Sequence, residues 1–118
     1  MTTNQIMNLD CREPENQEII QKVLRQVKPL SKCSDEFIPV EKIERTIKVL
    51  CVKYDLFVQS IIPDCHSNEK GIIWRAGIFN RKDLSHLGNA YGLTMYECLA
   101  KTAIYLYSIT RKGKCNEG

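Results

Sequence analysis

Apolar positions recur at helical spacing near both ends of the chain and alternate with polar positions in its middle. Apolar side chains follow helical spacing over residues 14–28, with Pro14 at a position that a first turn tolerates. The run ends at Pro29, and residues 29–38 have the composition of a linker. A second amphipathic helix is predicted over 39–54, with one apolar and one charged face.

The middle of the chain is rich in strand-forming residues. Residues 56–62 are β-branched or aromatic at most positions, and Pro63 ends the run. The clearest strand is predicted over 72–79, and a short third strand over 86–91 with a bulge at Gly88. Alternation in the second strand would place Ile72, Trp74, Ala76 and Ile78 on one face and Ile73, Arg75, Gly77 and Phe79 on the other.

A capping box opens the last predicted helix. Thr94 and Glu97 have the spacing at which each side chain caps the other residue's backbone amide, and the apolar pattern continues to about Thr110. The element order α-α-β-β-β-α therefore predicts an α+β fold, a three-stranded antiparallel sheet with helices packed on it. Residues 1–39 are expected to form a loose leader over 1–12 and then an amphipathic helix, and residues 40–118 to form an αβββα domain. We expect the two parts to pack as one compact unit.

One face of the predicted sheet lacks an obvious cover. If the face with Trp74 packs on the helices, Ile73 and Phe79 lie on the opposite face. Two such large apolar side chains are rarely left exposed to water together. Either the helix over 14–28 crosses that face, which gives a three-layer α/β/α sandwich, or a second copy of the chain packs there. The second arrangement predicts a homodimer or a higher homo-oligomer.

Charge and cysteine content narrow the class of protein. The 118 residues include 17 Lys and Arg against 14 Asp and Glu, a net charge of +3, and the excess lies in residues 40–118. This surplus favours an anionic partner at short range but is far from a dense nucleic-acid-binding stripe. No membrane span or secretory signal is visible, and the six cysteines lack metal-ligand spacing. We expect reduced thiols and a cytoplasmic protein.

The sequence shows little catalytic chemistry. Only His66 and His86 are available as imidazole bases, and neither lies in a nucleophile motif. The polar turn predicted over Asp64–Gly71 contains Cys65 beside His66, adjacent positions whose side chains usually diverge. No glycine-rich phosphate loop is present. We therefore predict a protein that is not an enzyme and has neither a metal site nor a cofactor.

The stretch from Lys70 to Thr94 combines cations with aromatic rings. Guanidinium groups hold oxyanions and aromatic faces stack on bases, so such a stretch suits a phosphate-bearing ligand. The alternative is structural: a charged hairpin turn, a tryptophan in the core and an arginine paired with an acid. The predicted ligand-binding residues are Trp74 and Tyr91 for stacking, Arg75, Arg81 and Lys82 for phosphate, His86 and Asn89 for hydrogen bonds, and Thr94 at the helix start.

About seventy residues from Val40 onward resemble the small αβββα domains of phage proteins known as phage ABA-sandwich domains. The resemblance is carried by a helix, the strand Ile73-Trp74-Arg75-Ala76-Gly77, and the helix opening Thr94-x-Tyr96-Glu97-Cys98-Leu99-Ala100 with Thr102 and Ala103 after it. It implies an accessory protein of a mobile element without a defined activity. By analogy, we expect it to sequester a small anionic ligand such as a nucleotide immune signal, or to inhibit a host enzyme by docking on it.

The order αβββα is also similar to that of double-stranded-RNA-binding domains. That family has lysines at the start of its last helix, which contact phosphates across the duplex. Here Met95, Tyr96 and Glu97 occupy those positions, and Lys101 follows alone. Duplex RNA binding therefore remains a third alternative behind the ligand-binding and protein-docking hypotheses.

Overall fold

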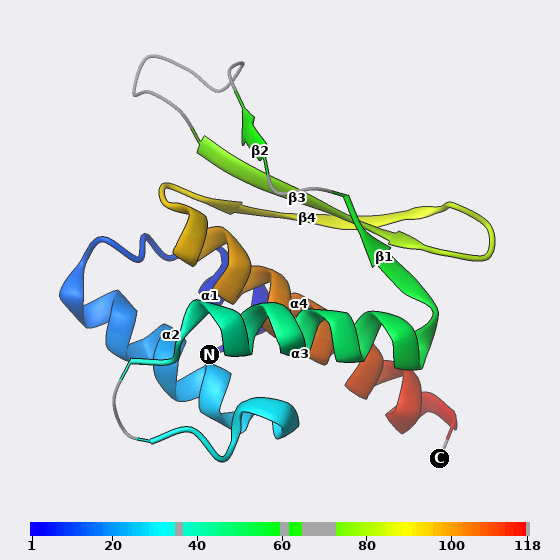
Figure 1. Cartoon of the computed structure of the whole chain (residues 1–118), viewed down its shortest axis with the longest axis horizontal. Coiled ribbons are helices and arrows are strands. Elements are labelled where there is room, and N and C mark those ends of the chain that lie inside the picture. Colours follow the sequence, from blue (N-terminus) through cyan, green and yellow to red (C-terminus); the bar gives the residue numbers. More distant parts are fainter. Residues whose placement is uncertain (35–36, 60–61, 65–72, 118) are drawn as a thin grey trace.

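A layer of helices covers one face of an antiparallel sheet, and no described helix lies over the other face (Figure 1). The computed structural model describes residues 1–34, 37–59, 62–64 and 73–117. The α+β class and the order of the main elements are as predicted. The elements are α1 (Thr3–Met7), α2 (Pro14–Gln26), η1 (Lys28–Leu30), α3 (Val40–Tyr54), β1 (Leu56–Val58), β2 (Ile62–Asp64), β3 (Ile73–Asn80), β4 (His86–Gly92) and α4 (Met95–Glu117).

Strand β3 is the centre of the sheet. β1 and β2 pair with the two ends of β3 along one edge, and β4 pairs along the other edge, all antiparallel. The register shifts between Ile78, which pairs with Gly88, and Phe79, which pairs with His86, so Leu87 is the extra residue of a bulge beside the predicted position. The predicted turn over Asp64–Gly71, apart from its first residue, lies outside the described residues, and so do Cys65 and His66.

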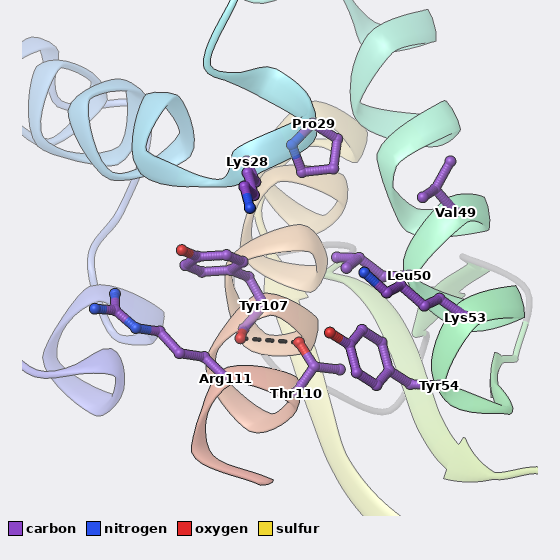
Figure 2. Close-up of a pocket in the computed structure, with 9 residues that line it drawn as sticks. All are labelled: Lys28, Pro29, Val49, Leu50, Lys53, Tyr54, Tyr107, Thr110 and Arg111. Carbon is purple, nitrogen blue, oxygen red and sulfur yellow. Dashed lines mark hydrogen bonds between the residues drawn. The ribbon is translucent and has the colours of Figure 1, made fainter. Parts of the chain in front are cut away.

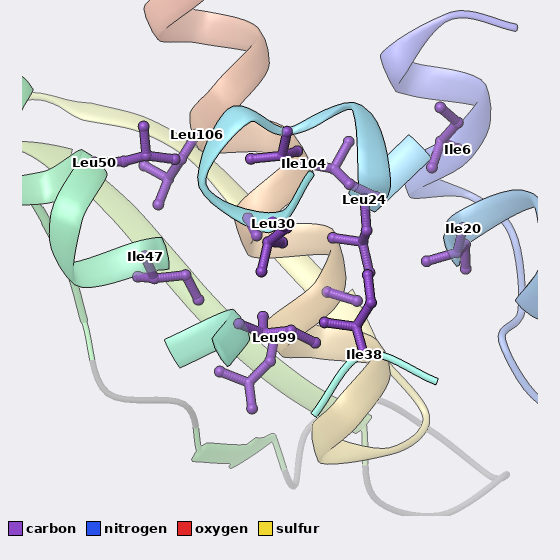
Figure 3. Close-up of a cluster of buried hydrophobic side chains, with 14 of the residues drawn as sticks. Ile6, Ile20, Leu24, Leu30, Ile38, Ile47, Leu50, Leu99, Ile104 and Leu106 are labelled. Atoms are coloured by element: carbon purple, nitrogen blue, oxygen red, sulfur yellow. The ribbon is translucent and has the colours of Figure 1, made fainter. Parts of the chain in front are cut away.

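Helix α4 packs on the sheet and against the other helices (Figure 1). Its apolar side chains meet those of α2, α3 and β1 in a single cluster, in which Leu24 and Leu106 are fully buried (Figure 3). Leu30 and Ile38, from the segment expected to be a linker, are also fully buried in this cluster. The segment is therefore part of the core. Helix α4 continues beyond the predicted end at Thr110.

The first twelve residues are not a loose leader. Thr2 caps helix α1 through a capping box with Gln5, and Ile6 is buried in the core. Further along, the amide of Cys11 donates to Glu97 Oε1 at 3.0 Å. The prediction was wrong because a five-residue helix is too short to show an apolar period.

The described residues form two layers, and the alternative in which the helix over 14–28 crosses the open face of the sheet is wrong. Helix α2 packs against α4 within the helical layer (Figure 1). Its apolar residues Ile20 and Leu24 are fully buried there, so the buried apolar side of α2 faces the helical layer and not the far side of the sheet. The face of the sheet that points away from the helical layer is therefore not covered by any described helix.

Tyr96, at the start of α4, has a buried hydroxyl that bonds to no other described residue. Its ring stacks on Phe37 with centroids 4.3 Å apart, and burial raises the pKa of Tyr96 to about 12. Because Phe keeps the ring and removes the unsatisfied group, we expect Tyr96→Phe to raise the free energy of unfolding by about 1 kcal/mol in urea unfolding. The matched control is Tyr105→Phe, which removes a hydroxyl that donates to the Leu87 carbonyl at 2.6 Å and should lower stability. A loss of stability in Tyr96→Phe would contradict this reading of the hydroxyl.

Candidate functional site

Alternate residues of three strands point away from the helices and form the outer face of the sheet. On the inner face Ala76 and Ala90 are fully buried against Cys98 of α4. Side chains alternate between the two faces along each strand, so the strand register places the remaining residues together on the other face of the sheet. The outer face comprises Phe57, Gln59, Arg75, Gly77, Phe79, His86, Asn89 and Tyr91.

Three rings form a row across the outer face. Phe57 of β1 and Phe79 of β3 are paired in register, and their rings stack with centroids 5.0 Å apart and planes 12° apart. On the other side of Phe79, the His86 ring of β4 lies 5.1 Å away at 56°. Each strand contributes one ring, so the row runs perpendicular to the strands.

Polar side chains continue the outer face along β4. His86 Nε2 lies 2.9 Å from Asn89 Oδ1, an oxygen that only accepts, so the histidine donates. The Asn89 amide nitrogen in turn donates to the Tyr91 hydroxyl at 3.3 Å. Arg75 is the register partner of Tyr91 on β3. The face thus presents rings at one end and the register pair of Arg75 and Tyr91 at the other.

Gly77 allows the side chains of the outer face to converge at its centre. A Cβ atom at this position would lie 2.9 Å from Phe79 Cε2 and 3.2 Å from Gln59 Oε1. Asn89, the register partner of Gly77, would lie 3.5 Å from that atom through Oδ1. A side chain at residue 77 would therefore displace the ring of Phe79 from the row.

Two cations extend from the hairpin turn beside the ring row. The side chains of Arg81 and Lys82 are exposed, and neither takes part in an ion pair with any described residue. The turn is held by its own polar groups: the Lys82 amide donates to Asn80 Oδ1 and the Ser85 amide to Asp83 Oδ1, each at 2.9 Å. The bonds from Ser85 lower the pKa of the Asp83 carboxyl. The turn therefore holds its shape without using the two cationic side chains.

The structure brings most of the predicted ligand-binding residues together. Arg75, His86, Asn89 and Tyr91 share the outer face, and Arg81 and Lys82 stand at its end.

Two predicted residues lie elsewhere. Trp74 is on the inner face, packed against the cluster of Ala76, Ala90 and Cys98. Thr94 Oγ1 accepts from the Glu97 amide at 3.1 Å, and the buried Glu97 carboxylate accepts from Leu93, so the start of α4 is occupied by its own residues.

Phe57, Phe79 and Gln59 were not predicted as site residues. Alternation in the sequence already placed Phe79 on the face of Arg75, which was the available signal. The pairing of Phe57 with Phe79 depends on the register between β1 and β3, which local patterns do not show. These two rings are half-buried and stack on one another.

The thiols of Cys11, Cys51 and Cys98 offer little nucleophilic character. Burial raises the pKa of the Cys98 thiol to about 12 and also raises the pKa of Cys11 and Cys51. A thiol with a raised pKa carries little thiolate at neutral pH. Among the described residues, no three His, Cys, Asp or Glu side chains group as metal ligands would.

Comparison with known proteins adds no relative. No protein-family model, curated protein or solved structure matches the chain. In the described part of the chain, no helix has the length and apolar content needed to cross a membrane. The chemistry of the outer face is therefore the guide to function.

Proposed function

We propose that the outer face binds nucleotide-type ligands, and that a single-stranded nucleic acid fits it best. The observation that carries the proposal is the row of Phe57, Phe79 and His86 across three strands, with cations at the adjacent turn. Antiparallel sheets with outward-facing aromatic residues recognise unpaired bases in some RNA-binding modules, and this comparison is an analogy of surface chemistry.

Base stacking supplies the main attraction. Each base stacked on an aromatic side chain is worth roughly 1–3 kcal/mol and any base has a suitable ring face. Tyr91, 45% exposed, offers a further ring toward the other end of the face. His86 and Asn89, already joined by a hydrogen bond, have remaining polar positions that suit base edges.

Phosphate groups would meet the cations of the hairpin. Arg81 and Lys82 are exposed beside the ring row, and a guanidinium forms paired hydrogen bonds to phosphate oxygens. The net charge of +3 supports attraction of a polyanion at low salt.

The row of rings runs across three strands, an extent that suits several nucleotides of a strand better than a lone nucleotide. Small ligands bind most tightly in hollows that bury most of their surface. Two cavities of the structure are lined by residues of the helical layer and the N-terminus, and no residue of the outer face lines either. The alternative ligand is a nucleotide immune signal that a phage protein would sequester. Its base and phosphate would use the same side chains of the outer face, so the experiment includes such ligands.

The proposal is tested by fluorescence anisotropy with a short labelled oligothymidylate at low salt, and by calorimetry with linear and cyclic nucleotides. We expect saturable oligonucleotide binding that weakens as salt rises. Tyr91→Ala should weaken it about tenfold, since one stacking ring is lost. The control Val52→Ala truncates an exposed side chain of α3 and should leave binding unchanged.

Charge removal at the turn provides the second arm of this experiment. The double variant Arg81→Gln/Lys82→Gln should weaken oligonucleotide binding about tenfold and reduce its salt dependence, with a nearly unchanged melting temperature. A large loss of melting temperature would mark these cations as structural. Absence of binding to every oligonucleotide and nucleotide would defeat the proposal, and tighter binding to a cyclic nucleotide than to the oligonucleotide would favour the sequestering hypothesis.

Docking of a protein is the second candidate function. Leu84 and Leu87, beside the ring row at the hairpin, are 66% and 38% exposed, which favours an apolar partner such as a host enzyme or a second copy of the chain. Light scattering that gives a dimer mass, with loss of the dimer in Leu84→Ser/Leu87→Ser, would support this candidate.

Duplex RNA completes the ligand panel. The carboxylate of Glu97 is buried at the start of α4 and paired with Lys101, so neither side chain is presented to a duplex. We expect weaker binding to duplex RNA than to the single strand.

A further inference from the structure

A cavity in the helical layer has the lining of an anion site. It has a volume of about 590 Å³ and lies between η1, the last turns of α3 and the C-terminal half of α4 (Figure 2). Its size is within the range of sites that hold small organic molecules. No residue of the outer face lines it, so it is separate from the proposed nucleic-acid site.

Three cations from three different elements border this cavity. Lys28 comes from η1, Lys53 from α3 and Arg111 from α4, and no acidic residue is among the described side chains that line it (Figure 2). Cations around one cavity repel one another, and solvent screens part of this repulsion because all three side chains are exposed. An anion that enters the cavity would remove this unfavourable interaction.

Apart from Thr110, the rest of the lining is apolar or aromatic. Lys53 Nζ lies 5.6 Å from the centroid of the Tyr54 ring, and the guanidinium carbon of Arg111 lies 5.9 Å from the centroid of the Tyr107 ring. Leu50 is buried at the cavity wall, and Val49 is 46% exposed on the same helix. The cations are therefore accompanied by apolar surface that a hydrated inorganic ion would leave unused.

We infer that this cavity binds a small organic anion in which a carboxylate, sulfonate or phosphate group is joined to an aromatic body. The positive charges of Lys28, Lys53 and Arg111 on the cavity rim attract the anionic group. The body packs against Leu50 and the two tyrosine rings, which burial in a hollow of this size permits. The inference does not depend on the proposed function of the outer face.

The probe for this site is 8-anilinonaphthalene-1-sulfonate, an aryl anion whose fluorescence rises on binding. N-phenyl-1-naphthylamine has the same rings without the sulfonate and is the matched neutral probe. We expect saturable binding of the sulfonate to the full-length chain, and binding of the neutral probe about tenfold weaker because its charge-assisted hydrogen bonds are missing.

Variants locate the bound probe. Lys53→Met and Arg111→Met should each weaken sulfonate binding about fivefold to tenfold, with unchanged circular dichroism because both side chains are exposed. The matched control is Lys48→Met, five residues earlier on α3, which removes an exposed lysine that does not line the cavity. Its affinity should equal that of the unmodified chain.

Other results would overturn the inference. Lack of saturable sulfonate binding, equal affinity for the neutral probe, or an equal loss in Lys48→Met would each show that the cavity is not a specific anion site. Sulfonate binding unaffected by both Lys53→Met and Arg111→Met would place the probe elsewhere and also overturn it. The variant Arg81→Gln/Lys82→Gln should bind the sulfonate normally, so failure here and failure of the proposed function are separable.

Discussion

Replacement of Lys101 by methionine is expected to lower the free energy of unfolding by about 3–5 kcal/mol, the range for breaking a buried ion pair from one side. Lys101 Nζ lies 2.7 Å from Glu97 Oε2, one helical turn earlier on α4. Both side chains are almost completely buried, at 4% and 2% exposure. Loss of the ammonium group would leave the Glu97 carboxylate charged, or force its protonation, inside the protein.

The buried pair also attaches the first segment of the chain to α4. Glu97 Oε1 accepts from the amides of Cys11 at 3.0 Å and Leu93 at 3.3 Å, and Lys101 donates to the carbonyl of Leu9. We therefore expect the residues around Leu9 and Cys11 to lose protection first in Lys101→Met, which amide hydrogen exchange can detect.

Two further variants separate charge from packing. Glu97→Gln/Lys101→Met keeps an oxygen acceptor for the amides but buries no charge, so it should recover a large part of the stability in urea unfolding. Arg12→Gln breaks the exposed pair with Asp10, which should matter little. A comparably small effect of Lys101→Met would contradict the assignment of the buried pair as a main stabilising contact.

This region shows what sequence patterns reveal and what they omit. The spacing of Thr94 and Glu97 correctly predicts the start of α4, and the Thr94 side chain caps the Glu97 amide. The same pattern does not reveal that the Glu97 carboxylate is buried with Lys101 or that it bonds to Cys11. Those contacts join positions far apart in the chain, and the first segment shows no apolar period of its own.

The sequence predicts which face of the sheet each residue of β3 occupies, but not which residues of the other strands lie beside it. Alternation along β3 correctly separates inward Trp74 and Ala76 from outward Arg75 and Phe79. The ring row additionally requires the register of β1 against β3 and the bulge at Leu87, which brings His86 opposite Phe79. Register follows from pairing across the sheet, so a single strand's pattern cannot contain it.

Cations that lie far apart in the sequence are the site residues that are hardest to predict from it. Lys28, Lys53 and Arg111 belong to three different helices, where each resembles an ordinary exposed residue. Only the packing of η1, α3 and α4 brings them around one cavity. The sequence instead drew attention to cations that are close in sequence, such as Arg81 and Lys82.

Alanine at Gly92 is expected to lower the free energy of unfolding by about 3 kcal/mol, the upper part of the range for overpacking. Gly92 is buried at the end of β4, where it pairs with Trp74. A Cβ atom there would lie 2.5 Å from the Cys98 amide nitrogen and 2.9 Å from the Thr94 carbonyl oxygen. Both are backbone atoms of the first turn of α4, so no side-chain rotation can relieve the contact.

Gly88→Ala is the matched control for Gly92→Ala, on the same strand. A Cβ atom at Gly88 would meet the outer end of the Tyr105 ring, with Cζ at 2.7 Å. That ring can rotate away at the cost of its hydrogen bond to Leu87, so we expect a loss of about 1 kcal/mol. The melting temperature of Gly92→Ala should consequently be several degrees below that of Gly88→Ala. Equal melting temperatures would show that the backbone at the junction of β4 and α4 can move to accept a side chain. The predicted difference would indicate that the close approach of these two elements requires glycine at residue 92.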